Sequence, residues 1–552
     1  MKGMMTFMNQ DISKKRRSLR IALISVIAVL ILNLFTFSVQ AKTAVLDTAK
    51  DIITNYYIED VSDKTLKATT IEDVIKSLND PYTQYFTADE YKRFTNDIDG
   101  KYSGIGIQIE IDPEGVKVLS VIDGTPAQAV GIKEGDIITK VDNHKLAGAA
   151  LEAAASYLRG EAGTVVNIQV KRDNSFHAYK ITRREFESPT IEGKMLDEHT
   201  AYIRIISFGD DTASLFKAKL EELGRENPDN FIVDLRNNGG GYLKTAQEMA
   251  YDFIGERPLV LLKDREGKEG KIMPDKGTSQ IDKPIIFLVN QYSASASEIL
   301  SAAVKDYKTA FLVGTTTYGK GTVQSMFGFS DGSVLKLSVE RFYSPLGNVI
   351  EKEGVTPDLT VGGEDSLAVA ELLSGKAGDG WDKRDFMKVK IDSREFEIDL
   401  KKARAIQYWD AYQYIMDKAL ESGYGISIGT VNGWVEANRA FLEEELYRCY
   451  YPEYMELSEL KSVPVNKVFT VIFLNDVNME SINDKNIELI NEASGERVPL
   501  KFEYNDKNSI IAVPAMELTK GGIYYFVINE DLESGDVSNY TKGDLVKVSV
   551  EE

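Results

Sequence analysis

The sequence predicts several domains arranged around an α/β core, in which a mixed sheet is flanked by helices. Three observations lead to this fold class. The length of 552 residues exceeds what one hydrophobic core organises. From about residue 200, apolar strand patterns alternate with helical patterns, as in an α/β core. Before and after that stretch the pattern changes to short alternating strands, which predicts smaller β-rich units on both sides.

Composition and charge narrow the classes of function. Hydrophobic residues make up 43% and charged residues 27%, an ordinary globular balance that excludes a disordered or multi-span membrane chain. The 65 basic and 86 acidic residues give a net charge of −21, so we expect no nucleic-acid partner. The single cysteine, Cys449, excludes intrachain disulfides, and with only 3 histidines we expect no metal site and no cofactor.

The N-terminus predicts a membrane segment. Residues 1–20 form a basic tail with six Lys or Arg residues and one acid, and residues 21–39 are uncharged and apolar. The run is close to the roughly 20 residues that span a bilayer, with the basic side in the cytoplasm. We favour a retained single-pass anchor over 21–41 in the cell membrane; cleavage of a signal after Ala41, which would secrete the protein, is the alternative. The remaining chain is then extracytoplasmic, and its lack of disulfides suggests a bacterial source.

Helical periodicity over 44–97 predicts an N-terminal helical region, and strand alternation begins near Tyr102. Residues 98–185 resemble a PDZ domain, because Gly104-Ile105-Gly106-Ile107 matches the family's carboxylate-binding loop and Gly135-Asp136-Ile137-Ile138 matches its G-D-x-I turn. The resemblance implies that the loop N–H groups capture a peptide's terminal carboxylate while a strand edge pairs with its main chain. The alternative is an isolated glycine-rich hairpin.

The α/β core is expected over 186–365. Its strands and helices are predicted from the apolar pattern at 201–206, 214–223, 231–235, 285–290, 297–304, 310–314 and 333–342. The segment Ser293-Ala294-Ser295-Ala296-Ser297-Glu298 lies where a buried strand meets a helix. Such a turn exposes a serine hydroxyl beside helix N-terminal N–H groups, which could stabilise an oxyanion. In isolation, however, Ser295 and Glu298 also fit a helix capping box.

A second segment, Tyr318-Gly319-Lys320-Gly321-Thr322-Val323-Gln324, follows the next strand. A lysine between two glycines suggests a side chain threaded into a tight space, where burial could lower its pKa enough for it to act as a base. None of the histidines (His144, His177 and His199) is near the serine in sequence. A phosphate-binding loop starting at Gly314 is disfavoured, because Gly321 replaces the Ser or Thr that binds magnesium.

Together with the Asp234–Gly241 run D-L-R-N-N-G-G-G, these segments resemble the carboxyl-terminal processing peptidases, which are serine endoproteases of a Ser-Lys type. The resemblance covers about 44–362. It implies that Ser295 is the nucleophile, with Ser293 and Ser297 as rivals. It further implies that Lys320 is the general base, that Gln324 orients it, and that the backbone N–H groups of Gly240 and Ala296 form the oxyanion site. The rival function is a non-catalytic surface scaffold that uses the PDZ and C-terminal modules.

The last third is expected to hold a helical extension over 366–463 and a β-sandwich over 464–552. The pattern at Val468–Phe473, Ile482-Asn483 and Asn486-Ile487 resembles Ig-like modules of bacterial surface proteins. Such a module could contact a regulatory protein or the cell wall. The expected substrates are proteins with apolar C-terminal tails, and the family resemblance makes a homodimer plausible.

Overall fold

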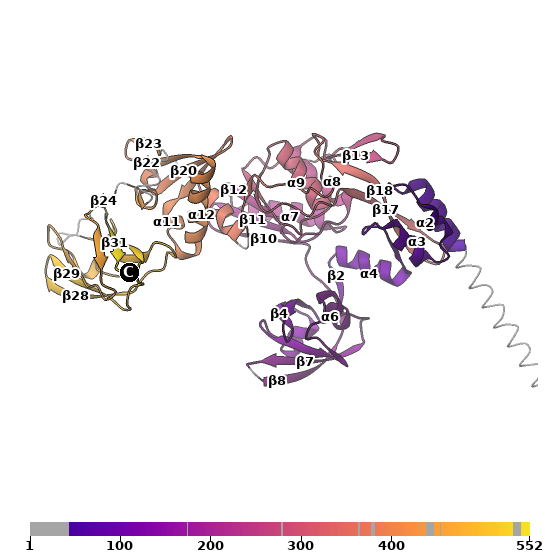
Figure 1. Ribbon diagram of the computed structural model, residues 1–552, viewed down its shortest axis with the longest axis horizontal. Coiled ribbons are helices and arrows are strands. Elements are labelled where there is room, and N and C mark those ends of the chain that lie inside the picture. The colour runs from indigo at the N-terminus through magenta and orange to yellow at the C-terminus, as the bar shows by residue number, and fades with distance from the viewer. Residues whose placement is uncertain are drawn as a thin grey trace, which may run out of the picture.

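The computed structural model describes residues 44–552 apart from 174, 278–279, 363–364, 377–380, 438–446, 453 and 534–542. The predicted basic tail and apolar anchor lie outside this part of the chain. Within these ranges, no helix is both long enough and apolar enough to cross a membrane. Figure 1 shows the N-terminal helices at one end of the molecule, the C-terminal sheets at the other, and one small domain hanging below the centre.

The N-terminal region contains a helix over 44–56, α2 (Asp63–Lys67), α3 (Ile71–Leu78), the short strand β1 (Gln84–Phe86) and α4 (Ala88–Ile98). It is therefore mostly helical but also contributes a strand, which the sequence analysis did not predict. β1 pairs antiparallel with β18 (Val334–Tyr343) of the core. Buried Ile53 and Val74 pack on Leu335 and Leu337 of β18, which fixes this region to the core.

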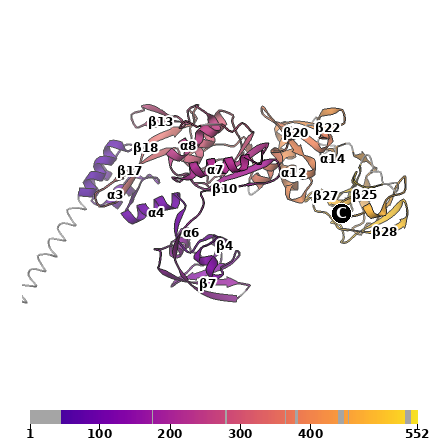
Figure 2. The same ribbon diagram turned by 180° about the vertical axis from the view of Figure 1, so that it is seen from behind.

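The hanging domain is a six-stranded sheet with two helices, in the order β3-β4-β5-β7-β8 with β6 on β5. Its elements are β3 (Ile107–Asp112), β4 (Gly115–Val121), α5 (Pro126–Val130), β5 (Ile137–Val141), β6 (His144–Lys145), α6 (Leu151–Leu158), β7 (Val165–Arg172) and β8 (Ser175–Thr182). Two paired strands, β2 (Lys101–Gly104) and β9 (Arg184–Glu187), carry the chain in and out. Both views show the chain passing between this domain and the rest through this pair of strands (Figures 1 and 2).

The central domain has a six-stranded mixed sheet in the order β10-β11-β12-β15-β16-β19. The strands are β10 (Ile191–Met195), β11 (Thr200–Ile205), β12 (Asn230–Asp234), β15 (Ile285–Val289), β16 (Phe311–Gly314) and β19 (Leu359–Thr360). Only β10 runs antiparallel to its neighbour. β12, β15 and β16 are buried along most of their length, which explains their nearly continuous apolar sequences.

Helices cover both faces of this sheet. α7 (Thr212–Gly224), α8 (Leu243–Ile254) and α9 (Ala296–Asp306) share one hydrophobic core with it. α10 (Ser366–Leu373) and later residues cover the other face. A second sheet contains β1, β18, β13 (Val260–Asp264) and β14 (Glu269–Ile272), with β17 (Thr322–Gly328) paired to β18.

The predicted helical extension over 366–463 is corrected by the structure. α11 (Leu400–Ala403), α12 (Ile406–Ser422) and α14 (Tyr447–Tyr450) are present, but so is a four-stranded sheet in the order β21-β20-β22-β23. Its strands are β20 (Phe386–Ile391), β21 (Arg394–Asp399), β22 (Gly425–Thr430) and β23 (Gly433–Ala437). In β21, buried Phe396 and Ile398 alternate with more exposed residues, which is the period of a strand rather than of a helix.

The C-terminal residues form two sheets around one hydrophobic core. One sheet has the order β24-β31-β30-β27 with β25 on β31, and the other has the order β26-β29-β28. The strands are β24 (Met455–Glu456), β25 (Leu460–Val463), β26 (Phe469–Ile472), β27 (Ile487–Asn491), β28 (Leu500–Asp506), β29 (Ser509–Pro514), β30 (Ile523–Ile528) and β31 (Asp544–Val550). Phe469 stacks on Phe526 across the two sheets, at 4.8 Å between ring centroids. The likeness to Ig-like modules stays a prediction.

Candidate active site

Ser295 occupies a sharp turn between β15 and the first residue of α9. Its backbone angles are φ 57° and ψ −112°, a conformation that costs a non-glycine residue roughly 1–3 kcal/mol. A Cβ atom added to Gly240 would lie 2.8 Å from the Ser295 Cβ, so only glycine fits opposite this turn. A strained serine at a strand-to-helix turn is the arrangement that exposes a nucleophile beside helix N-terminal N–H groups.

The two rival serines have structural roles. Ser293 and Ser297 are fully buried. The Ser293 hydroxyl donates to the Leu235 carbonyl over 2.8 Å, and the Ser297 hydroxyl donates to the Asn238 carbonyl over 2.9 Å. Both bonds tie the serine turn to the D-L-R-N-N segment. Neither hydroxyl is available to a substrate, which leaves Ser295 as the candidate nucleophile.

The glycines on both sides of Lys320 allow a close approach of loop 350–353. Gly319 has φ 87°, and a Cβ there would lie 3.0 Å from the Lys352 carbonyl carbon. A Cβ on Gly321 would lie 2.5 Å from the Glu351 backbone nitrogen. The two glycines beside Lys320 in the sequence are thus explained by the close approach of loop 350–353. Strand β17 follows the lysine instead of a helix, which removes the phosphate-loop alternative.

Glu298 joins the serine turn to the lysine loop. One carboxylate oxygen, Oε2, accepts the backbone N–H groups of both Ser295 and Lys320, each over 2.9 Å. The other, Oε1, accepts the Thr317 hydroxyl and the Gly319 N–H, each over 2.6 Å. The backbone nitrogen atoms of Ser295 and Lys320 are therefore close together, because each lies 2.9 Å from the same oxygen atom. The predicted capping interaction exists, but the same carboxylate also fixes the position of the candidate base.

Burial and neighbouring carboxylates have opposite effects on the pKa of Lys320. Burial lowers the pKa of the Lys320 amine, while the carboxylates of Glu298, Asp80 and Glu351 act to raise it. The net direction is downward, which favours the neutral amine that a general base requires. The Nζ atom lies 5.3 Å from the centroid of the Tyr82 ring, which covers it from the N-terminal region. Sequence analysis missed Asp80, Tyr82 and Glu351, because they are distant along the chain.

Two predicted site residues make other contacts. Gln324 donates its side-chain amide to the carbonyl and the hydroxyl of Thr322, each over 2.9 Å, and no hydrogen bond to Lys320 is present. The β-bulge between Val323 and Gln324 changes the strand's register at this point. The Gly240 N–H donates to Asn238 Oδ1 over 2.8 Å, so this predicted oxyanion donor is already used.

The other predicted oxyanion donor remains available. Within the described residues, the Ala296 N–H at the start of α9 has no hydrogen-bond partner. In the described part of the chain, the N–H groups of Gly239 and Gly241, on either side of Gly240, are also without a partner. The helix N-terminus adds partial positive charge at Ala296.

Hydrogen bonds to the D-L-R-N-N segment hold the serine turn in place. Buried Asp234 accepts Arg236 through both carboxylate oxygens and the Tyr202 hydroxyl over 2.7 Å. Asn238 donates its side-chain amide to the Ile205 carbonyl over 2.7 Å and accepts the Ala294 N–H over 3.0 Å. This motif therefore holds the ends of β11 and β12 and the serine turn together.

The histidines lie elsewhere. His144 stacks on Tyr157, with 4.0 Å between ring centroids, and His177 lies in β8, both in the hanging domain. His199 Nδ1 lies 2.8 Å from Asp229 Oδ2. His199 directly precedes β11, whereas Asp234 of β12 pairs with Arg204 near the opposite end of β11. Lysine is the base that the geometry supports.

The hanging domain has a free loop and a free strand edge. Gly106 has φ 85°, and its carbonyl accepts the Ile122 N–H over 3.1 Å, which holds the loop of residues 104–107. Within the described part of the chain, the N–H groups of Ile105 and Gly106 have no partner. The following strand, β3, lies at the edge of its sheet beside α6.

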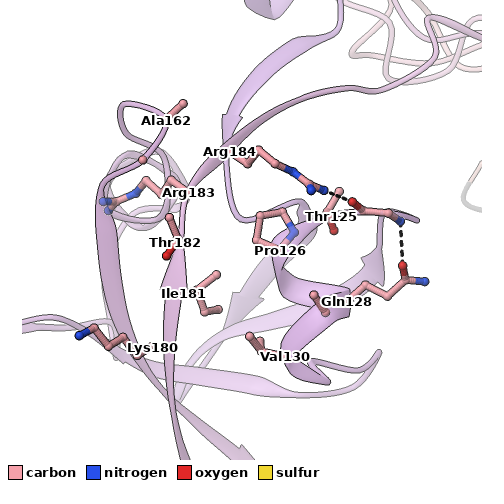
Figure 3. Close-up of a pocket in the computed structure, with 13 residues that line it drawn as sticks. Thr125, Pro126, Gln128, Val130, Ala162, Lys180, Ile181, Thr182, Arg183 and Arg184 are labelled. Carbon is pink, nitrogen blue, oxygen red and sulfur yellow. Dashed lines mark hydrogen bonds between the residues drawn. The ribbon is translucent and has the colours of Figure 1, made fainter.

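Two cavities adjoin this domain. One, of about 840 Å³, separates α6 from α4 and is lined by Ser103, Leu151 and Ala155. An ion pair of 2.9 Å between Arg159 and Asp97 joins the two helical elements. The other, of about 780 Å³, lies between α5 and β8. Its lining residue Thr125 donates its hydroxyl to the Gly106 carbonyl of the 104–107 loop. At this cavity Arg184 donates to the Gly124 carbonyl and the Gln128 side chain accepts the Gly124 N–H (Figure 3).

Comparison with known proteins decides the family. Residues 199–361 match the model of peptidase family S41, residues 103–182 match a PDZ domain, and residues 35–90 match the N-terminal domain of the activating protease CtpB. A probable CtpA-like serine protease of Staphylococcus haemolyticus is 31% identical over 368 residues, 64% of this chain and 74% of the relative. The chain belongs to peptidase family S41.

Other relatives agree. A probable CtpA-like serine protease of Staphylococcus epidermidis is 34% identical over 309 residues, 56% of this chain and 62% of the relative. The photosystem II D1 C-terminal processing protease has a TM-score of 0.43 at 24% identity, over 61% of this chain and 98% of that structure. The family model and the curated CtpA-like relatives make the protein a serine-type peptidase with a PDZ domain, as the sequence motifs predicted. Family membership as a peptidase disfavours the non-catalytic scaffold.

Proposed function

We propose that the protein is a membrane-anchored, extracytoplasmic endopeptidase that captures apolar C-terminal tails with its PDZ domain and cleaves the captured chain with Ser295 and Lys320. The observation that carries the catalytic part is the strained Ser295 turn, which shares one Glu298 oxygen with the backbone of Lys320. A shared carboxylate fixes the geometry of nucleophile and base before substrate arrives, which is how enzymes avoid reorganisation during reaction.

The reaction is an acyl transfer. Neutral Lys320 accepts the proton of the Ser295 hydroxyl as its oxygen attacks the scissile carbonyl. The Ala296 N–H at the start of α9 donates to the oxygen that becomes negative. Protonated Lys320 then returns the proton to the leaving amine, and water releases the acyl group by the same steps in the same order.

Tail capture is supported by the 104–107 loop. The N–H groups of Ile105 and Gly106 are available for a terminal carboxylate. The edge of β3 is available for main-chain pairing. A peptide can therefore add to the domain as an extra strand, with its C-terminus at the loop. Membrane anchoring rests on the sequence pattern of residues 1–39.

Proteolysis of a loosely folded reporter tests the proposal. The full-length protein is incubated with reporters that end in an apolar or a charged tail. We expect cleavage of the apolar-tailed reporter, and its loss in Ser295→Ala and in Lys320→Ala with the fold intact by circular dichroism. Ser214→Ala, at an exposed position of α7, serves as the matched control and should retain cleavage. Cleavage that survives in Ser295→Ala would place the nucleophile elsewhere, and equal cleavage of both reporters would remove tail selection.

A further inference from the structure

Tyr82 belongs to the N-terminal region, but its side chain lies against the active-site lysine. The Lys320 Nζ atom is 5.3 Å from the centroid of the Tyr82 ring. The lysine backbone is fixed separately, because its N–H donates to Glu298 Oε2 over 2.9 Å. Within the described part of the chain, no hydrogen bond or ion pair holds the Nζ atom, so the position of the amine depends on what it packs against.

The backbone that carries the Tyr82 ring is firmly attached to the second sheet. Asp80 accepts the Tyr82 N–H over 2.9 Å and the Thr83 hydroxyl over 2.6 Å. The buried Thr83 hydroxyl oxygen also accepts the Ser338 N–H of β18 over 3.2 Å. Pairing of β1 with β18 begins at the next residue, Gln84. The ring is therefore held beside the lysine by the fold of the N-terminal region.

The other groups around the lysine are charged, whereas the ring is neutral. The groups whose charge acts on the Lys320 amine are three carboxylates, those of Glu298, Asp80 and Glu351. The charge of Lys320 acts in turn on the Lys336 amine of β18. Tyr82 stays an uncharged phenol, because burial, followed by Tyr318 and Glu351, raises its pKa well above the ordinary value. Its ring therefore meets the amine as an aromatic face and not as a phenolate.

An aromatic face distinguishes the two forms of a lysine amine. Its negative potential attracts an ammonium group far more strongly than a neutral amine. In the proposed reaction, Lys320 is neutral at first and becomes an ammonium group as it accepts the serine proton. A ring already in place stabilises the charge that develops in the transition state. The resting amine still favours its neutral form, because burial outweighs the groups that raise its pKa.

We propose that Tyr82 is a positioning residue of the active site: its ring fixes the Lys320 amine and stabilises the ammonium group that forms when this amine accepts the serine proton. The inference rests on the proposed Ser295–Lys320 pair. It gives the N-terminal region a part in the reaction, because that region supplies both the ring and the Asp80 turn that holds it. The role belongs to the ring and not to the Tyr82 hydroxyl.

The test weakens the aromatic face while nearly preserving the size of the ring. Position 82 of the full-length protein carries phenylalanine and then monofluoro-, difluoro- and trifluorophenylalanine, in which fluorine withdraws electron density from the face. We expect Tyr82→Phe to keep kcat within about twofold of the wild type. Along the fluorinated series kcat should fall stepwise, by about tenfold in total, at constant KM. The acid limb of kcat/KM should move to lower pH by up to about one unit.

The matched control is the same series at Tyr343 of β18, whose ring lies 5.3 Å from the Lys263 Nζ atom. It should change neither kcat nor the acid limb. A loss of kcat already present in Tyr82→Phe would assign the role to the hydroxyl and overturn the proposal. An equal kcat across the Tyr82 series would also overturn it. So would an acid limb that moves to higher pH, the result expected if the substitutions only let water reach the lysine.

A measurement without turnover separates this inference from the proposed function. Competitive acetylation across pH, followed by mass spectrometry, titrates Lys320 in the inactive Ser295→Ala protein. We expect the pKa of Lys320 to fall stepwise along the same series at position 82, because the ammonium form loses its stabilisation. A constant pKa would overturn the inference. Cleavage retained by Ser295→Ala would instead overturn the proposed function, on which the inference rests.

Discussion

At the scale of single residues, the active site depends on side chains that are strained or taken out of water. Ser295 has positive φ, and Lys320 has a lowered pKa because it is partly buried. Both conditions destabilise the folded protein and both favour the reaction. Glu298 compensates by accepting four hydrogen bonds from the two loops that carry them. Natural active sites commonly show this exchange of stability for activity.

The lowered pKa of Lys320 predicts that replacing this lysine abolishes cleavage but stabilises the fold. Unfolded chains bind the lysine proton up to about pH 10.4, whereas the folded protein releases it at lower pH. Stability therefore rises with pH between the lowered pKa and about 10.4. We expect Lys320→Met to abolish cleavage but to raise the midpoint of thermal unfolding at pH 7, with a smaller gain near pH 10. An unchanged or lower midpoint at pH 7 would contradict the assigned direction.

Glu298 is predicted to be needed for activity although it does not touch the reacting atoms. In Glu298→Gln an amide nitrogen replaces one acceptor, so at least one of the loop N–H groups loses its partner. We expect cleavage to fall at least tenfold, about 1.4 kcal/mol of transition-state stabilisation, with the fold intact. Glu221→Gln, on the exposed face of α7, is the matched control. Equal rates in both variants would show that the carboxylate is only a cap.

At the scale of elements, two glycines decide whether the lysine loop can close onto loop 350–353. A Cβ at position 321 would meet the backbone of Glu351 rather than a flexible side chain, so the loop itself must move. Such a movement would displace the neighbouring Lys320. The same strand offers a comparison, because Gly328 at its other end has open space where a Cβ would be.

We expect Gly321→Ala to lower kcat by at least tenfold, since small displacements of a catalytic group cost that much. Gly328→Ala should leave both kcat and the thermal midpoint nearly unchanged. Cleavage kinetics and thermal unfolding of the two variants check this. A fully active Gly321→Ala would show that the close approach has no bearing on the position of Lys320.

At the scale of the whole molecule, the domains differ in how firmly they are attached. The PDZ domain is joined to the rest by β2 and β9, with the Arg159–Asp97 ion pair beside them (Figure 2). Residues 366–463, by contrast, share a hydrophobic core with the central sheet, where Ile286 and Phe311 pack with Val369, Met387 and Ile415. The last two sheets have a further core of their own, and the larger sheet also reaches the shared core, through Ile490, Tyr525, Val527 and Leu545. The Trp409 indole of α12 also donates to the Glu492 carbonyl over 2.8 Å.

This difference predicts unequal results of two truncations. A chain that ends at residue 454 lacks every strand of the last two sheets, and we expect it to fold and cleave with a lower thermal midpoint. A chain that ends at residue 362 exposes one whole face of the central sheet and should aggregate. Expression yield, size-exclusion chromatography and cleavage distinguish them. A soluble, active protein ending at 362 would show that the extension is dispensable for folding.

The sequence by itself determined the α/β core and the PDZ domain, and it predicted Ser295 and Lys320 as the catalytic pair. All of these depend on local patterns: apolar strands of the right length, and glycines next to a lysine or small residues next to a serine. It failed where contacts join distant segments. Glu298 fits a helix cap in the sequence, but its carboxylate also binds the lysine loop, 22 residues further along the chain at Lys320. Two other failures were local: Gly240 donates to Asn238, two residues before it, and the alternating pattern of β21 was assigned to a helical extension. Only the tertiary structure decided that Asp80, Tyr82 and Glu351 lie around Lys320, since a pKa depends on proximity in space rather than along the chain.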